Sequence, residues 1–425
     1  MLHAPRTAPV AASTPPVPSP PAPSPAVPSP AVAPPSTAPP RAVSWEEART
    51  RAHDAGRPSA GRPVPLREAL GRTLAEDLRT RHPLPAFDTA AMDGFAVAAG
   101  PGPWTVRGAA RAGAPWPGAL GPGDCVEIST GACVPAGAHA VLPVELASVS
   151  GSRVSGDAHP SGRHVRRAGE DAGAGECLAP AGTQVGPALI GLAAACGHDV
   201  LTVRPRPRVG VLVTGDELDR TGVPSAGRVR DALGPLLPGL IDRLGGETVA
   251  LRYVPDRPAA RLTEELAGLG DVDVVVVTGS TSVGVTDRLR RLLADSGARM
   301  LVDTVACRPG HPMLLAELPS AGRLVGLPGN PYAALVAART VLGPLLAGLS
   351  GRALGTLPRM PVRGRLRAAP GLTRVVPVSW ADGEVGIVEG HRAAFLRGAA
   401  VGDALAAIGP EWTEGDLAPL LLPGA

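Results

Sequence analysis

Small and polar residues follow several apolar runs in the second half of the chain. They stand at Thr214 to Glu217, at Asp256, at Gly279 to Asp287 and at Pro328 to Pro331. If the runs are neighbouring parallel strands, their carboxyl ends meet at one edge of the sheet, where open α/β sheets bind ligands. The spacing therefore predicts a single ligand site built from several loops.

The loop from Gly279 to Gly284 reads Gly-Ser-Thr-Ser-Val-Gly and follows four consecutive valines, Val274 to Val277. Small residues let backbone N–H groups face inward, and the N-terminus of a following helix favours an anion. The same letters also form ordinary turns. They match neither a Walker loop nor a dinucleotide fingerprint, because the Gly-Lys-Ser/Thr ending and the GxGxxG spacing are missing. The motif alone leaves a phosphate cradle and a plain turn open.

Three carboxylates, Glu217, Asp256 and Asp287, are expected at the same sheet edge. Carboxylates that converge beside a phosphate repel one another unless a cation joins them, and hard oxygen ligands suit Mg²⁺. Each could instead cap a helix, as Asp256 and Asp287 would do well before the helical patterns that follow them. As a set, the three favour a magnesium site.

Two Pro-Gly motifs lie near the end of this stretch, Cys307 to Pro312 and Gly326 to Pro331. Proline, glycine and asparagine fix unusual backbone shapes, so the second motif predicts a rigid turn before a helix. In the first motif, Arg308 and His311 are candidate anion contacts. A lone histidine does not indicate a metal site, and Cys307 is expected to be a buried, inert thiol although an arginine follows it.

The composition excludes several classes of protein. The chain has 425 residues, contains no lysine, carries a net charge of +3 and is only 2% aromatic. Dispersed arginines without aromatic residues do not predict a nucleic-acid partner. Five cysteines without a CxxC motif favour a reducing compartment. We find no apolar run of membrane-span length and no basic-then-apolar order of a signal peptide, so we predict a cytoplasmic protein without a membrane partner.

The order of apolar and helical patterns predicts a multidomain α/β protein. The tail of residues 1–40 is rich in Pro, Ala and Ser and is expected to be disordered. Alternating strand and helix patterns predict a doubly wound domain with a parallel sheet. The predicted domains are a helical linker domain over 41–78 with 163–206, a β-rich insertion domain over 79–162, the α/β domain over 207–357 and a small C-terminal β domain over 358–425.

Several blocks together resemble one family, the molybdopterin molybdenumtransferases, which includes the C-terminal domain of gephyrin. The blocks occur in the family's order: LPAFDTAAMDGFAV (84–97), EISTGACVPAGAHAVLPVE (127–145), GRHVRRAGED (162–171), RVGVLVTGDEL (208–218), VVVTGSTSVGVTD (275–287), CRPGHP (307–312) and GLPGNP (326–331). The resemblance covers about residues 41–425. It implies a homodimer of four-domain subunits that inserts molybdate into the dithiolene of adenylylated molybdopterin, with Mg²⁺ as cofactor and release of AMP.

The resemblance also assigns roles to individual residues. It implies catalytic positions at Asp93, Thr130, Glu217, Asp256 and Asp287, of which the last three would hold Mg²⁺ and the first two would reach the partner's nucleotide site. The expected substrate-binding residues are Thr214, Gly215, Gly279, Ser280, Ser282, Gly284, Arg308, Pro328, Gly329, Asn330 and Pro331. The linker domain would contribute to the dimer, and the α/β domain would bind the molybdopterin.

The chain departs from the family at several positions. The family's Gly-Gly-Val-Ser loop is Gly279-Ser-Thr-Ser282 here, and its Asp-Ser-Asn block is reduced to Asp231-Ala-Leu233. Its usual lysines are replaced by Thr304, Arg308 and His311, and its usual serine by Ala333. Since only arginine reliably keeps the charge, these changes favour an alternative, a catalytically impaired molybdopterin-binding or scaffold protein. A nucleotide-pyrophosphate hydrolase is a second alternative, against which the presence of Asp93 and Thr130 argues.

Overall fold

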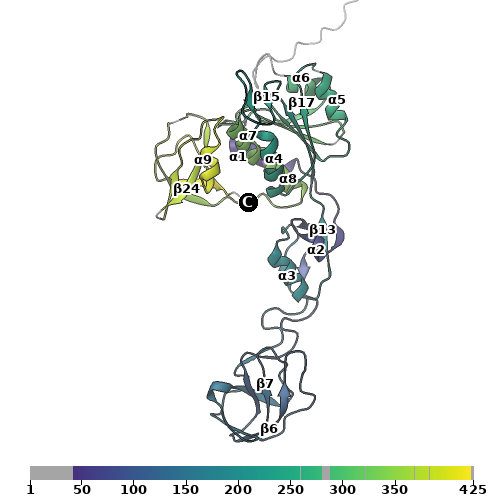
Figure 1. The fold of residues 1–425 in the computed structure, drawn as a ribbon, viewed down its shortest axis with the longest axis vertical. Helices are drawn as coiled ribbons and strands as arrows, with labels where there is room; N and C mark the ends of the chain where they lie inside the picture. Colours follow the sequence, from purple (N-terminus) through teal and green to yellow (C-terminus); the bar gives the residue numbers. More distant parts are fainter. Residues whose placement is uncertain are drawn as a thin grey trace, which may run out of the picture. The chain divides into compact units, whose positions relative to one another are not determined.

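The computed structural model describes residues 42–422 except 259, 280–287, 321, 368 and 382. The sheet that carries the predicted ligand site is shown in the upper part of Figure 1. Its strands, in spatial order, are β17 (Glu247–Val254), β14 (Arg208–Thr214), β18 (Val274–Thr278), β22 (Arg323–Leu327), β21 (Leu314–Glu317) and β19 (Arg299–Val302). The parallel pairing of β17, β14, β18 and β22 confirms the predicted parallel core.

The pair β21 and β19 extends this sheet in the antiparallel sense. The connection from β21 to β22 is short, residues 318–322. A connection of this length can form a hairpin but cannot hold the helix that a parallel crossover requires. The sheet is therefore mixed, and the antiparallel strands lie at the edge away from the predicted site.

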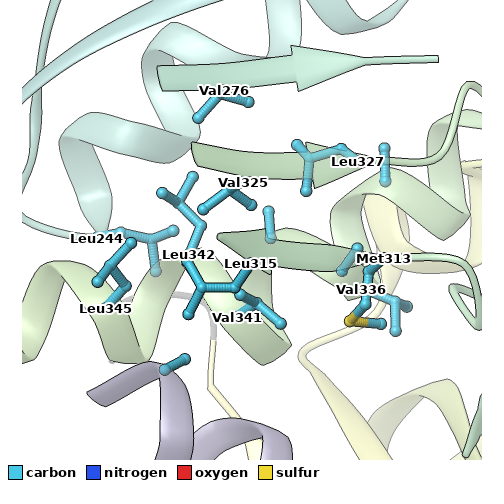
Figure 2. Packing of buried hydrophobic residues seen from close by; sticks show 14 of the residues in the cluster. Leu244, Val276, Met313, Leu315, Val325, Leu327, Val336, Val341, Leu342 and Leu345 are labelled. Carbon is cyan, nitrogen blue, oxygen red and sulfur yellow. The ribbon is translucent and has the colours of Figure 1, made fainter. Parts of the chain in front are cut away.

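Helices cover both faces of the sheet, as a doubly wound domain requires (Figure 1). One face packs against α4 (Leu233–Arg243), α7 (Pro331–Ala337) and α8 (Gly343–Leu349), and the other against α5 (Ala260–Ala267) and α6 (Arg288–Asp295). Val274 and Val276 belong to the first core, and Val275 and Val277 to the second. Figure 2 shows the first core, with Val276 and Val325 facing Leu342. Burial on both faces explains why this strand is a run of valines.

The helix after β22 is the most apolar segment of the described chain. α7, the π-helical turn η2 (Ala338–Leu342) and α8 run continuously over Pro331–Leu349, 19 residues long and apolar enough to cross a membrane by length and composition. The prediction that no apolar run reaches membrane-span length was therefore wrong. Because 78% of its apolar window is buried inside the protein, the run is accounted for as a core helix.

The first helix, α1 (Trp45–Asp54), begins as predicted, since the Ser44 hydroxyl accepts the Glu47 N–H at 3.1 Å. Trp45 is buried and donates its indole N–H to Thr340 in η2 at 3.0 Å. α1 therefore packs into the core of the α/β domain, although its sequence lies within the segment 41–78 that we assigned to the linker.

The remainder of the linker segment is not purely helical. It contains a sheet in the order β1 (Arg62–Pro65), β13 (Val200–Arg204), β2 (Thr73–Leu74), the pair β3 (Leu78–Arg79) and β12 (Cys177–Ala179), and the helices α2 (Leu66–Ala69) and α3 (Pro187–Ala195). Val203 and Leu74 are buried between the strands and helices. The sheet forms because residues 200–204 alternate in burial along the strand.

The predicted insertion domain is β-rich, as expected. Its sheet has the order β8 (Ala138–Pro143), β5 (Gly94–Ala98), β7 (Asp124–Ile128), β6 (Trp104–Ala110), β10 (Arg153–Ser155), β9 (Ser148–Ser150). The short helix η1 (Val144–Leu146) and the pair β4 (Thr89–Ala90) and β11 (Val165–Arg166) complete it. Two hydrophobic clusters, one with Val126 and one with Trp104, pack on its strands.

The C-terminal segment forms a closed β-barrel. Its strands are β23 (Arg359–Arg363), β24 (Thr373–Ala381), β25 (Glu384–Ile387), β26 (Ala404–Ile408) and β27 (Leu417–Leu421), with the short helix α9 (Arg397–Val401). β26 pairs with both β27 and β24, so the strands close into a ring. The short strand β20 (Cys307–Arg308) of the α/β segment pairs with β24. The barrel is thereby hydrogen-bonded to the predicted site region.

Candidate functional site

The carboxyl ends of β14, β18 and β22 pack directly against one another. The Thr214 hydroxyl donates to the Thr278 carbonyl oxygen at 2.6 Å. Gly279 has a φ of +71°, and a Cβ at this position would lie 2.8 Å from the Thr214 hydroxyl oxygen. A Cβ on Gly329 would in turn lie 3.7 Å from the Cα of Gly279. Only glycine suits position 279, and the backbone of neighbouring loops comes close together there.

Two carboxylates join the loops after β14 and β17. The Asp256 N–H donates to Asp216 Oδ1 at 2.9 Å, and the Asp216 N–H donates to Asp256 Oδ2 at 3.3 Å. The observed hydrogen bonds of Asp256 therefore connect it to another strand end, which favours the site over the helix cap. Asp216 was absent from the predicted site residues, although it lies next to Glu217.

Glu217 occupies a more peripheral place than expected. It is exposed, and a Cβ on Gly215 would lie 2.8 Å from Glu217 Oε2, so its carboxylate folds back over that glycine. Its carbonyl oxygen accepts the Val229 N–H at 2.8 Å, beside the short pairing of β15 (Leu218–Asp219) with β16 (Val229–Arg230). The structure thus pairs Asp256 with Asp216 by hydrogen bonds, and Glu217 remains next to them in the same loop.

Four of the predicted residues, Ser280, Ser282, Gly284 and Asp287, lie outside the described residues. Within the described part of the chain, no group of three or more acidic, histidine or cysteine side chains could hold a metal ion. Mg²⁺ in phosphate sites is usually held by one or two carboxylates together with substrate oxygens and water. The pair Asp216 and Asp256 is a donor set of this kind.

The turn before α7 exposes its polar side chain. Pro328 is buried, Gly329 and Asn330 are exposed, and Pro331 occupies the first turn of the helix. Asn330 is the N-cap residue, but its side chain makes no capping hydrogen bond; its carbonyl oxygen accepts the Ala334 N–H at 2.9 Å. The Asn330 carboxamide is therefore available to a ligand. We call these residues, with Thr214–Glu217, Asp256 and Gly279, the sheet-edge site.

Beside the start of α7 lies a basic cavity of about 1000 Å³ between β20 and loops of the barrel. We call its basic lining the arginine pocket: Arg308, Arg374, His391, Arg392 and Arg397. Glu389 is the carboxylate among its described lining residues. The buried Arg374 Nε has no hydrogen-bond partner within the described structure. A buried guanidinium nitrogen without a partner is costly in the absence of an acceptor, so the pocket is suited to an oxyanion.

The arginine pocket is connected to the sheet-edge site through the backbone. The Ala333 N–H, in the first turn of α7, donates to the Ala393 carbonyl oxygen at 3.0 Å. The Tyr332 hydroxyl donates to the Val375 carbonyl oxygen at 2.9 Å. Sequence reasoning found Arg308 but missed Arg374, Arg392 and Arg397. The chain has no lysine and its arginines are spread along its length, so no sequence signal distinguishes these three arginines from the others.

The other altered positions have structural roles. Thr304 is buried, and its carbonyl oxygen accepts the Val43 N–H at 3.1 Å. Nδ1 of His311 lies 2.7 Å from the Val305 carbonyl oxygen. Asp231 is buried, where it accepts the Leu233 N–H at 2.9 Å and the Tyr253 hydroxyl at 2.8 Å. None of these contacts reaches the arginine pocket.

Cys307 is a buried thiol, as predicted. Burial raises its pKa to about 12, so the thiol stays protonated near neutral pH and is a poor nucleophile.

In the insertion domain, the structure brings Asp93 and Thr130 together. Asp93 Oδ1 accepts the Thr130 N–H at 2.6 Å and the Thr130 hydroxyl at 3.0 Å. These two donors, the backbone N–H first, hold the pKa of Asp93 below its ordinary value, with Arg111 contributing at longer range. Both residues are exposed. They therefore present an ionised carboxylate on the domain surface.

Two family models match the chain. Residues 43–197 match the MoeA N-terminal region (domain I and II), and residues 210–348 match a probable molybdopterin binding domain. A solved structure, the molybdopterin biosynthesis moeA protein from Pyrococcus horikoshii OT3, aligns over 90% of this chain and 100% of its own with a TM-score of 0.75. At 22% identity it shows a shared fold.

Curated relatives extend the similarity to the level of the family. The molybdopterin molybdenumtransferase of Synechococcus elongatus is 35% identical over 68% of this chain and 75% of its own length. The molybdopterin molybdenumtransferase 1 of Mycobacterium tuberculosis is 33% identical over 81% of this chain and 84% of its own length. The residue ranges matched by the two family models include Asp93, Asp256 and Gly329. The chain therefore belongs to the molybdopterin molybdenumtransferases, a family of transferases of molybdenum cofactor biosynthesis.

Proposed function

We propose that the protein inserts molybdate into adenylylated molybdopterin in a magnesium-dependent reaction that releases AMP. One observation carries the proposal: an acidic site and a basic pocket flank the same helix start. Asp216 and Asp256 lie at the carboxyl ends of the strands, and the arginine pocket opens beside Ala333, only a few residues after Gly329. A reaction that joins an anionic cofactor to an oxyanion needs a cation-binding acidic site and a basic pocket, both within reach of the same bound substrate.

The acidic site would hold the phosphate end of the substrate together with the cation. Asp216 and Asp256 would hold Mg²⁺, with Glu217 and Asp287 as further carboxylates, and the ion, when bound, supplies neutralisation of charge on the diphosphate. The Asn330 carboxamide and the backbone around Gly279 would hydrogen-bond the pterin end. Their fixed position lowers the reorganisation needed when the substrate binds.

The arginine pocket would hold molybdate. Thr304 and His311 are engaged elsewhere, so of the three positions where the family has lysine only Arg308 supplies a cation here. Arg374, Arg392 and Arg397 offer positive charge from a different part of the chain. Guanidinium groups bind oxyanions through paired N–H donors, so this set can replace the missing lysines.

Asp93 would act across a homodimer. Thr130 keeps its carboxylate ionised and oriented, and both side chains are exposed on the insertion domain. An exposed, fixed carboxylate that is remote in sequence from the α/β domain is consistent with a contribution to the partner's site, as the family resemblance implies.

The test uses the full chain with adenylylated molybdopterin, Mg²⁺ and increasing molybdate, and measures AMP and active molybdenum cofactor. We expect AMP release that depends on molybdate and is lost in Asp256→Ala. Asp271→Ala serves as the matched control, because Asp271 is 99% exposed at the start of β18, the end of the strand away from the site. Substrate binding without turnover would indicate a scaffold protein, and AMP release that does not need molybdate would indicate a hydrolase.

A further inference from the structure

A single charged residue interrupts the apolar run of α7, η2 and α8. Arg339 is the only charged residue of Pro331–Leu349, and it is only 6% exposed. It stands in the π-helical turn η2, and such turns are frequent at functional sites. Burial of a charge costs free energy unless an opposite charge or several acceptors surround it. A single buried charge in such a run therefore requires partners around it.

The protein supplies few of these partners. Nη2 of Arg339 donates to the Leu422 carbonyl oxygen. Among the described residues, Nε and Nη1 have no hydrogen-bond partner, and no carboxylate forms an ion pair with the side chain. One neutral acceptor does not compensate a buried positive charge. The guanidinium therefore has donors left for an anion.

A second buried guanidinium adds to the positive charge. Arg49 in α1 is 8% exposed, and its Nη1 donates to the Arg339 carbonyl oxygen at 3.3 Å. Burial and then the charge of Arg339 lower the pKa of Arg49 to about 10, against a smaller opposite effect of the exposed Glu46. Both arginines stay cationic at neutral pH, so their charges repel each other and favour an anion beside them.

Arg339 lines a cavity of about 130 Å³ between the α/β domain and the barrel. Arg243, the last residue of α4, also lines it, is exposed and forms no ion pair among the described residues. No acidic side chain belongs to the described lining. The largest apolar residues of the wall come from α4, α7, β26 and β27: Leu240, Leu335, Leu405 and Leu421. The cavity thus combines positive charge with an aliphatic wall.

This lining favours one class of anion. A tetrahedral oxyanion such as phosphate would direct some of its oxygens at leucine side chains, where they would lose their hydrogen bonds to water. A short-chain monocarboxylate presents both oxygens at one end, where guanidinium N–H groups bind them, and hydrocarbon at the other. Since an apolar cavity of about 150 Å³ holds a six-carbon ring, this one suits an aliphatic chain of about four carbons.

We propose that this cavity binds a short-chain aliphatic monocarboxylate, with the carboxylate on Arg339 and Arg243 and the hydrocarbon chain between Leu240 and Leu405. The site shares no described lining residue with the arginine pocket, although α9 contributes Ala399 to the first and Arg397 to the second. Its occupancy does not depend on the proposed reaction.

The test measures binding of butyrate to the full chain by isothermal titration calorimetry at constant ionic strength, without molybdate. We expect butyrate to bind more tightly than formate, by about fourfold for each methylene that enters the cavity, and n-butylammonium not to bind. Arg339→Gln should weaken butyrate by at least about tenfold, as for loss of a charge-assisted hydrogen bond. Arg243→Gln should weaken it about two- to fivefold, because this side chain is exposed.

A cavity-filling variant tests the site without removal of a charge, and it remains informative if Arg339→Gln does not fold. Ala399→Leu places extra carbon atoms in the cavity and should abolish butyrate binding. Ala400→Leu in the same helix is the matched control, since Ala400 is exposed and does not line the cavity. Arg374→Gln, in the arginine pocket, should leave butyrate affinity unchanged. Thermal unfolding checks that each variant is folded.

Several results would overturn the proposal. Absence of butyrate binding to the wild-type chain would do so directly, and equal affinity for formate and butyrate would show attraction by charge alone. Unchanged butyrate affinity in folded Ala399→Leu and Arg243→Gln would exclude this cavity as the site. Loss of binding in Arg374→Gln would place the carboxylate in the arginine pocket instead.

Discussion

The sheet-edge site and the arginine pocket flank the same helix start but are built in different ways. At the sheet edge, backbones pack so closely that Gly279 leaves no room for a side chain, and the loops after β14 and β17 are tied by Asp216 and Asp256. In the arginine pocket, long side chains from β20 and from β24, α9 and a loop of the barrel converge on an open cavity. The first site is defined by backbone geometry, the second by charge.

This difference indicates how each region should respond to mutation. A backbone-defined site has little freedom to relax, so single changes should have large effects on activity or stability. A pocket lined by several like charges shares its binding energy among them, so single changes should be partly compensated. The variants below test that ordering, from the largest expected effect to the smallest.

Asp256→Asn should cause the largest loss. The substitution removes a carboxylate charge expected to be worth several kcal/mol in metal-assisted phosphate chemistry, so we expect AMP release to fall about 1000-fold. Single-turnover AMP release with Mg²⁺ in excess measures the effect, and Asp271→Asn should behave as wild type. A loss of AMP release below tenfold in Asp256→Asn would contradict the expectation that the acidic site is more sensitive to mutation than the arginine pocket.

Gly279→Ala should destabilise the domain as well as the site. A methyl group there would meet the Thr214 hydroxyl and would have to adopt a φ of +71°. The strain costs about 1–3 kcal/mol in unfolding free energy, measurable by urea denaturation. Gly239→Ala in α4 is the matched control, since nothing lies within 4 Å of its Cβ position, and it should be neutral or stabilising. Equal stability of the two variants would contradict close packing at the sheet edge.

Arg374→Gln should have a moderate effect. Loss of one charge-assisted contact to an oxyanion corresponds to about a tenfold rise in the molybdate concentration that half-saturates AMP release. Arg359→Gln on the exposed face of the barrel provides the control. A thousandfold rise would show that charge in this pocket is not shared.

Thr130→Val should give the smallest effect, a change in one pKa. The largest cause of the lowered pKa of Asp93 is the hydrogen bond from the Thr130 backbone N–H, which the variant keeps. The Thr130 hydroxyl, which the variant loses, is the next largest cause. The pKa should rise only part of the way to its ordinary value, as measured by carboxyl NMR titration. Asp416, held by Thr413 in the same manner, should titrate as in wild type.

The sign of this effect follows from linkage. A carboxylate whose folded pKa is lowered stabilises the fold above its unfolded pKa, and that contribution disappears as pH falls through the folded pKa. Thr130→Val should therefore lose this contribution at a higher pH than wild type during acid unfolding. An unchanged Asp93 titration would mean that the hydroxyl does not orient the carboxylate.

The parallel core could be predicted because the relevant signals are local. Four valines in succession require a strand buried on both faces, and the small and polar residues after it mark its exposed end. The antiparallel strands β19 and β21 were missed because residues 299–317 also contain the Pro-Gly motif, which obscured two short strands.

The arginine pocket could not be predicted by the same means. Its residues come from positions 308, 374 and 391–397, and only the pairing of β20 with β24 and the bond from Ala333 to Ala393 bring them together. Long-range pairings leave no periodic signal in the sequence. Asp216 could have been predicted, because it lies directly after the strand. The prediction chose its neighbour Glu217 as the carboxylate of that loop.

The closed ring of the C-terminal barrel has an evolutionary consequence. Strands that pair on both sides hold the segments between them at fixed ends, so residues outside the strands, such as Arg392 in a loop and Arg397 in α9, can be exchanged without opening the ring. Gly279 at the sheet edge has no such freedom. A lineage could therefore lose the lysines of one motif and recover an oxyanion site from loops of another domain, while the acidic half of the site remained in place.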